Sequence, residues 1–136
     1  MESKKSILIK CPLYLDIERK TMKDKRYYIN LNTYRNLHHR VNNNLKKMYL
    51  EAVRSQLEGL TIETPCNVTY KVVKPSKRTL DKMNVVSITS KYLMDAITKL
   101  GCWEDDNDDF IKTETILPTE YLKNEGSVQV LITSCD

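Results

Sequence analysis

Two long segments with apolar residues at helical spacing, each followed by a glycine, constrain the fold of this chain more than any other feature. Apolar residues three and four positions apart share one face of a helix, and a glycine after the last turn commonly ends it. We therefore predict two main helices, from Asn32 or Thr33 to about Glu58 before Gly59, and from near Thr79 or Leu80 to Leu100 before Gly101. The buried stripe of the first is expected to comprise Leu37, Val41, Leu45, Met48 and Ala52, and to end at Gln56-Leu57.

Four further segments have the composition or the alternation of β-strands. They are Ser6–Leu15, Cys66–Val73, Phe110–Leu117 and Ser127–Thr133. Pro12 breaks the first segment or places it at a sheet edge, because proline has no backbone N–H to donate. Residues 19–28 are charged and are predicted to form a surface loop. The order β, α, β, α, β, β predicts an α/β (α+β) fold, a compact single domain over residues 1–136 with a mixed sheet packed against the two helices.

Composition limits the chemistry that the chain can perform. The four cysteines include no C-x-x-C pair and the only two histidines are the adjacent His38 and His39, so the ligand spacing of a zinc site is missing. We expect reduced thiols, surface or partly buried structural histidines, and metal binding through carboxylates. Residues 1–5 are polar and no apolar run approaches the about 18 residues of a membrane span. We therefore expect no membrane segment, no signal peptide and a cytoplasmic location.

Charged residues concentrate at both ends of the second predicted helix. The net charge is only +4, so the position of the charges is more informative than their sum. At the start of the helix, Asp81 lies among the basic residues Lys71, Lys74, Lys77, Arg78 and Lys82. Just past its end, five of the six residues from Glu104 to Asp109 are acidic. Cations that hold DNA phosphates beside carboxylates that hold Mg²⁺ are what a phosphodiester-cleaving enzyme requires.

A helical wheel adds a polar stripe between these two clusters. Asp81, Asn84, Ile88, Lys91 and Asp95 fall on one side, next to the apolar side that includes Val85, Thr89, Tyr92, Leu93, Ala96 and Leu100. If the acidic turn presented Asp105 and Asp106 opposite Asp81, the three carboxylates would form a seat for Mg²⁺. A solvated helix face and an ordinary acidic surface loop explain the same residues without any site. Motifs of phosphate-binding loops, serine hydrolases and zinc proteases are all missing.

The segment Lys91–Asp106 resembles the K-x-x-x-D-A-L-x-x-x-G-x-W-x-D-D stretch of RusA-like Holliday-junction resolvases. After a basic loop over residues 74–78, the segment Asp81-Lys82-Met83-Asn84 resembles the R-R-D-L-D-N element of that family. Residues 26–36 resemble the N-terminal segment of phage-encoded members from Gram-positive hosts. The match spans roughly residues 26 to 110. It departs from the family pattern at Met83, where the family has a second aspartate, and in the spacing from Asn84 to Lys91, which is about four residues or one helical turn longer.

The resemblance implies an intertwined α/β homodimer that nicks four-way DNA junctions symmetrically with Mg²⁺, or with Mn²⁺ in its place, in the cytosol of a bacterium or a phage-infected cell. The family's catalytic aspartates fall on Asp81 and Asp106, with Asp105 beside them, and its lysine falls on Lys91. Metal ligands are then Asp81, Asp105 and Asp106, with Asn84, Asp108 or Asp109 as candidates to replace the oxygen lost at Met83. The predicted DNA-binding residues are Lys74, Lys77, Arg78, Lys82 and Asn84.

Two other functions fit the same residues. A relative with a decayed metal site would clamp junctions without cutting them. A structural or protein-interaction domain would carry these charges only for solubility. Recombination, repair and debranching of DNA before phage packaging all suit the family, and the sequence does not choose among them.

Overall fold

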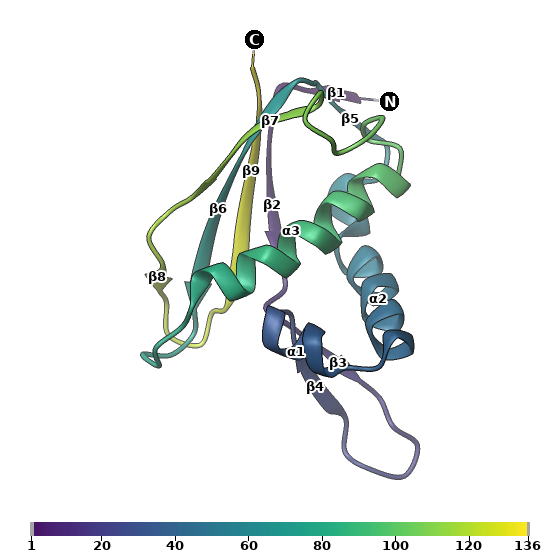
Figure 1. Ribbon diagram of the computed structural model, residues 1–136, viewed down its shortest axis with the longest axis vertical. Helices are drawn as coiled ribbons and strands as arrows, with labels where there is room; N and C mark the ends of the chain where they lie inside the picture. The colour runs from purple at the N-terminus through teal and green to yellow at the C-terminus, as the bar shows by residue number, and fades with distance from the viewer. Residues whose placement is uncertain (1, 136) are drawn as a thin grey trace.

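A mixed sheet of five strands forms the centre of the computed structural model, which describes residues 2–135 (Figure 1). Four of its strands lie in the order β2 (Ser6–Cys11), β9 (Ser127–Ser134), β6 (Cys66–Lys74) and β7 (Ile111–Ile116). β9 is antiparallel to both β2 and β6, whereas β7 is parallel to β6. The short β8 (Glu120–Tyr121) pairs with the end of β6. The predicted class, mixed α+β with a mixed sheet, is confirmed.

Two smaller strand pairs lie at opposite ends of the molecule (Figure 1). β1 (Glu2–Lys4) runs parallel to β5 (Leu60–Ile62), and neither strand was predicted. β3 (Tyr14–Ile17) and β4 (Lys25–Tyr28) form an antiparallel hairpin. The prediction of a loop over residues 19–28 is therefore wrong for its last four residues. The predicted strand Ser6–Leu15 is divided at Pro12, and its second part belongs to the hairpin.

Three helices pack with the sheet: α1 (Leu31–Asn36), α2 (His39–Leu57) and α3 (Lys82–Lys99). Figure 1 shows α3 crossing one face of the sheet, and α2 to the side of the sheet that is bordered by β2. Gln56 of α2 holds the edge of β2: its Nε2 donates to the Lys10 carbonyl, and its Oε1 accepts from the Lys10 N–H, both at 2.8 Å. This side chain occupies the backbone groups that a further strand would use. Within residues 2–135, no helix combines the length and the hydrophobicity that crossing a lipid bilayer requires.

The first predicted helix is wrong as a single element, because the chain breaks between α1 and α2. Leu37 and His38 are both extended, and the Nδ1 atom of His38 accepts a hydrogen bond from the N–H of Arg40, which begins α2 anew. The buried residues of α2 are Leu45, Tyr49, Val53 and Leu57. The predicted stripe is thus right at Leu45 and Leu57 and wrong at Met48, which is only half-buried, and at Ala52, which is exposed. Both histidines are exposed.

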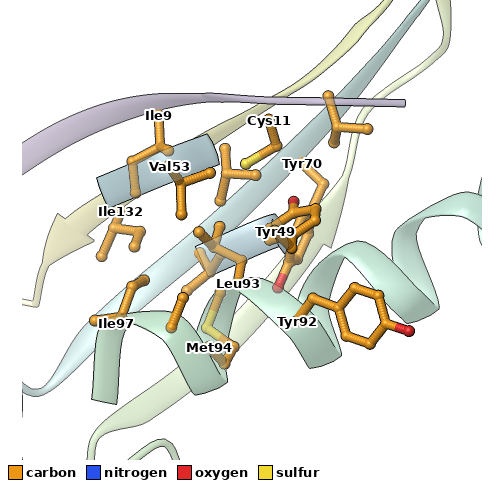
Figure 2. Packing of buried hydrophobic residues seen from close by; sticks show 14 of the residues in the cluster. Ile9, Cys11, Tyr49, Val53, Tyr70, Tyr92, Leu93, Met94, Ile97 and Ile132 are labelled. Atoms are coloured by element: carbon orange, nitrogen blue, oxygen red, sulfur yellow. The ribbon is translucent and has the colours of Figure 1, made fainter. Parts of the chain in front are cut away.

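One cluster of buried hydrophobic side chains joins the helices to the sheet. Figure 2 shows Tyr49 and Val53 of α2 and Leu93 and Ile97 of α3 meeting residues of the central strands such as Tyr70. Each fully buried side chain of this size stabilises the fold by about 1.5–3 kcal/mol. α3 contributes nine buried residues, so its position on the sheet is strongly determined. This packing also fixes the positions of the two ends of α3, and with them the side chains that these ends carry.

The four cysteines are free in the structure, and Cys11, Cys66 and Cys102 are buried. Burial raises the pKa of the Cys11 thiol to about 12 and that of the Cys66 thiol to about 11. Because the thiolate is the reactive and metal-binding form, these side chains act as apolar core residues. Among residues 2–135, no group of three or more histidine, cysteine, aspartate or glutamate side chains is placed to hold a metal ion.

Candidate functional site

Asp81 is the N-cap of α3, so the helix begins at Lys82, two or three residues later than predicted. Its Oδ1 atom accepts hydrogen bonds from the backbone N–H groups of Met83 at 3.1 Å and Asn84 at 3.4 Å. These N–H groups have no partner within the helix, which is why aspartate is favoured at this position. Both bonds use the same oxygen, and Asp81 is exposed. The second carboxylate oxygen therefore stays available to a cation, a water molecule or a ligand.

Asp81 lines a cleft of about 760 Å³. The β3–β4 hairpin, the end of β6 with the loop after it, the first turn of α3 and the loop before β9 each supply polar or aromatic side chains. We call it the basic cleft, and its functional groups come from Tyr14, Arg26, Tyr28, Lys74, Ser76, Arg78, Asp81, Asn84 and Asn124. The charged groups in this lining are three cations and one carboxylate.

Contacts within the basic cleft fix some of its cations and leave others free. Arg26 donates to Asp16 at 2.9 Å, and its guanidinium lies 3.7 Å from the ring centroid of Tyr14. The hydrogen bond from Arg26 lowers the pKa of the Asp16 carboxyl. Lys74 donates from Nζ to the carbonyl of Arg78 at 3.2 Å, which ties the two ends of the basic loop together. Within the described part of the chain, the guanidinium of Arg78 has no hydrogen-bond or ion-pair partner.

A second, smaller cavity of about 210 Å³ lies along the other half of α3. We call it the acidic cavity, and its charged residues are Lys91, Asp106, Asp108, Lys112 and Glu114. Glu114 is held in place, because its Oε1 accepts hydrogen bonds from the hydroxyl groups of Tyr70 at 2.7 Å and Ser90 at 3.2 Å. Desolvation raises the pKa of Asp106, and the neighbouring carboxylates of Asp105 and Asp95 add to this effect.

The structure brings some of the predicted site residues together and separates others. Lys74, Arg78, Asp81 and Asn84 line the basic cleft, and Lys91 and Asp106 line the acidic cavity. Lys77, Lys82 and Asp105 line neither. Ser90 of the acidic cavity follows Asp81 by nine residues, which is about 13 Å along a helix axis. Asp81 and Asp106 line different cavities, and Mg²⁺ binds oxygen at about 2.1 Å, so we do not expect one ion to contact both within one subunit.

The predicted polar stripe along α3 is not a continuous functional face. Ile88 is buried at 4 % exposure, and Asp95 forms ion pairs at 3.3 Å with Lys46 of α2 and with Lys99. Asp95 thus connects two helices. The ammonium group of Lys91 lies 5.7 Å from the ring centroid of Tyr34 of α1. The stripe is thus divided: Asp81 and Asn84 line the basic cleft and Lys91 lines the acidic cavity. Ile88 and Asp95 line neither cavity and serve the packing of the fold.

Sequence reasoning missed the contribution of the hairpin to the basic cleft. Tyr14, Arg26 and Tyr28 lie in segments that were predicted as the end of a strand and as a charged loop. The available signal was the Lys-Arg-Tyr-Tyr run at residues 25–28, which has the aromatic content of a strand. It also missed Glu114, whose role depends on strand pairing between β6 and β7.

A scan against protein-family models and a search of curated proteins found no match for this chain. The similarity to RusA-like resolvases therefore rests on the residues quoted in the sequence analysis.

Proposed function

We propose that this protein is a Mg²⁺-dependent, structure-specific endodeoxyribonuclease that resolves four-way DNA junctions by symmetric nicking. We further propose that it has a RusA-like fold, acts as an intertwined homodimer, and works in the cytosol of a bacterium or a phage-infected cell. A second candidate function is junction binding without cleavage. Met83 favours that alternative, because its thioether cannot replace the carboxylate of the family as a ligand for a hard cation.

The observation that carries the proposal is the composition of the basic cleft. An exposed carboxylate, Asp81, lies in one cleft with the ammonium group of Lys74 and the unpaired guanidinium of Arg78. Guanidinium and ammonium groups bind backbone phosphates. A carboxylate beside bound phosphate supports Mg²⁺ binding, since this ion is often held by one or two carboxylates together with phosphate oxygens and water. In a nuclease, such an ion activates water and neutralises charge on the phosphate.

The three predicted metal ligands do not fit one ion within one subunit, because Asp81 and Asp106 lie in different cavities. The homodimer offers a way to unite them. In a two-fold symmetric dimer every contact occurs twice, so the acidic turn of one subunit beside the basic cleft of the other would create two equivalent sites. Two such sites would also match the two-fold symmetry of a four-way junction. Lys91, which lines the same cavity as Asp106, is proposed to orient water or to neutralise developing charge.

A cleavage assay tests the proposal directly. A synthetic four-way junction and a linear duplex of matching sequence are incubated with the protein in Mg²⁺, in Mn²⁺ and in a chelator. We expect paired nicks on the junction only, and only with metal. Tight junction binding without nicks in either metal would favour the second candidate function. Absence of DNA binding at low salt would contradict both and leave a structural or protein-interaction domain.

Two carboxylate variants test the assigned residues. Asp81→Asn and Asp106→Asn are each expected to abolish cleavage while DNA binding persists. Asp24→Asn removes an exposed carboxylate that lines neither cavity and serves as the matched control. Cleavage that persists in both site variants would refute the assignment of these two aspartates.

A further inference from the structure

We propose that the basic cleft binds a single unpaired nucleotide of the DNA, with its base against the ring of Tyr28 and its phosphate on Arg78 and Lys74. The inference rests on the proposed DNA-binding function and specifies which part of the substrate this cleft takes. The cleft volume of about 760 Å³ lies within the range of about 300–1,000 Å³ that is typical of pockets for small organic ligands. A nucleotide fits a space of this size, and a duplex does not.

The hairpin supplies a prearranged aromatic surface. Tyr28 is 52 % exposed at the cleft, although tyrosine rings are usually more buried than this. Its ring packs edge-to-face on that of Tyr14, with 5.8 Å between centroids, and Arg26 covers Tyr14 from within 3.7 Å. The ion pair of Arg26 with Asp16 across the hairpin fixes this arrangement. A ring supported from behind and open in front can stack on a base without first becoming ordered.

Phosphate-binding groups line the same cleft and come from a different element than Tyr28. The guanidinium of Arg78 is unpaired in the described part of the chain, and Lys74 uses one of its three N–H donors on the carbonyl of Arg78. Arg26 is already neutralised by Asp16, so Arg78 and Lys74 carry the charge that remains available. Figure 1 shows the hairpin and the loop after β6 at the same end of the molecule. The cleft thus combines an aromatic ring from the hairpin with available cations from the end of β6 and the loop after it.

Two amide side chains complete the environment of a base. Asn84 of α3 and Asn124 of the loop before β9 line the cleft, and neither side-chain amide has a hydrogen-bond partner in residues 2–135. Each amide both donates and accepts, so it can bond to the edge of any base. We therefore expect binding that requires a base but discriminates little among bases. Paired bases have these edges occupied, which favours an unpaired nucleotide such as one at a branch point.

The binding experiment separates the base from the phosphates. Affinities are measured by fluorescence anisotropy for a short oligothymidylate and for an abasic oligomer with the same number of phosphates. For the wild-type protein we expect between about fivefold and a hundredfold tighter binding of the oligothymidylate, as base stacking on an aromatic ring provides. Tyr28→Leu should remove this preference and leave the affinity for the abasic oligomer unchanged.

Control variants keep this test interpretable. Tyr121→Leu removes a tyrosine that is 38 % exposed and lies outside the cleft, and it should keep the preference. Tyr28→Trp should also keep it, because indole stacks on bases. Thermal unfolding of each variant identifies any loss of fold. A preference that is missing in the wild type, or that survives in folded Tyr28→Leu, would overturn the inference. Equal competition by free thymidine monophosphate and by the oligomer would also overturn it, since the cleft would then bind free nucleotides.

The base-preference measurement and the junction cleavage assay test the two proposals separately. Paired nicks on junctions together with a base preference that is indifferent to Tyr28 would refute the nucleotide pocket and leave the nuclease proposal standing. A base preference that depends on Tyr28, in a protein that cuts no junction, would support the pocket and refute the nuclease.

Discussion

Asp81 has two proposed roles, and substitution by asparagine or by alanine separates them. As the N-cap of α3 it accepts hydrogen bonds from Met83 and Asn84 through one oxygen. As a proposed metal ligand it needs the negative charge of the carboxylate. Asparagine caps helices about as well as aspartate but carries no charge, whereas alanine neither caps the helix nor carries a charge. The two variants should therefore differ in stability and agree in their loss of cleavage.

The geometry of the cap sets the size of the stability change. The bond to the N–H of Met83 is 3.1 Å long, but the bond to Asn84 is 3.4 Å, at the weak end of the range. Both variants lose the interaction of the carboxylate charge with the helix dipole, about 0.3–1 kcal/mol at an exposed end. Only Asp81→Ala also loses the cap, so we expect its free energy of unfolding to be about 1 kcal/mol lower than that of Asp81→Asn. For a chain of 136 residues this difference corresponds to a melting temperature lower by roughly 3–5 °C.

Thermal unfolding followed by circular dichroism, together with the junction assay in Mg²⁺, measures both effects on the same preparations. Wild-type cleavage by Asp81→Asn would show that Asp81 is only a cap. Equal destabilisation by asparagine and alanine would refute the capping argument. Because α3 buries nine residues, neither variant is expected to unfold, so a loss of cleavage in the asparagine variant reports on the carboxylate.

Three further outcomes are expected from the structure. When Asp81→Asn and Asp106→Asn subunits are mixed in equal amounts, about half of the dimers are mixed, and one of the two sites in each mixed dimer keeps both carboxylates. Junction cleavage should therefore recover to about a quarter of the wild-type level. Absence of recovery would contradict a site that combines the two aspartates across the dimer. Native protein should expose one rapidly reacting thiol, Cys135, to a maleimide, and all four after denaturation; a second fast thiol would contradict the burial of the others. Tyr70→Phe should lower the free energy of unfolding by about 1–2 kcal/mol, since it removes the 2.7 Å hydrogen bond to Glu114; an unchanged urea midpoint would show that this bond contributes nothing.

The sequence predicted the elements with many buried residues well. The alternation of Val68, Tyr70 and Val72 predicts β6, because both its pattern and its burial have period two. α3 follows from its apolar spacing and from Gly101, whose positive φ of 73° ends the helix. Short or exposed elements escaped prediction. β4 is a strand because it pairs with β3. Its charged residues, considered alone, resemble those of a loop.

The start of α2 and the composition of the site were less predictable for a common reason. Helical spacing continues across Leu37 and His38, and only the hydrogen bond from Arg40 to the side chain of His38 marks a new helix. At the site, Asp81 and the basic loop are neighbours in the sequence, so their proximity was foreseeable. Tyr28 joins them only through the fold, more than forty residues away along the chain, and no local pattern reports such a contact.

The two cavities along α3 differ in the charges that line them, and under the proposed function they therefore have different roles. The basic cleft carries three cations and one carboxylate, whereas three carboxylates and two lysines line the acidic cavity. Phosphates are attracted to the first and repelled by uncompensated carboxylates at the second. DNA affinity should thus arise at the basic cleft, while the acidic turn becomes compatible with a phosphate only when a divalent cation lies between them. Under the proposed function we therefore expect DNA binding without metal and cleavage only with metal, and the carboxylate variants should separate the two.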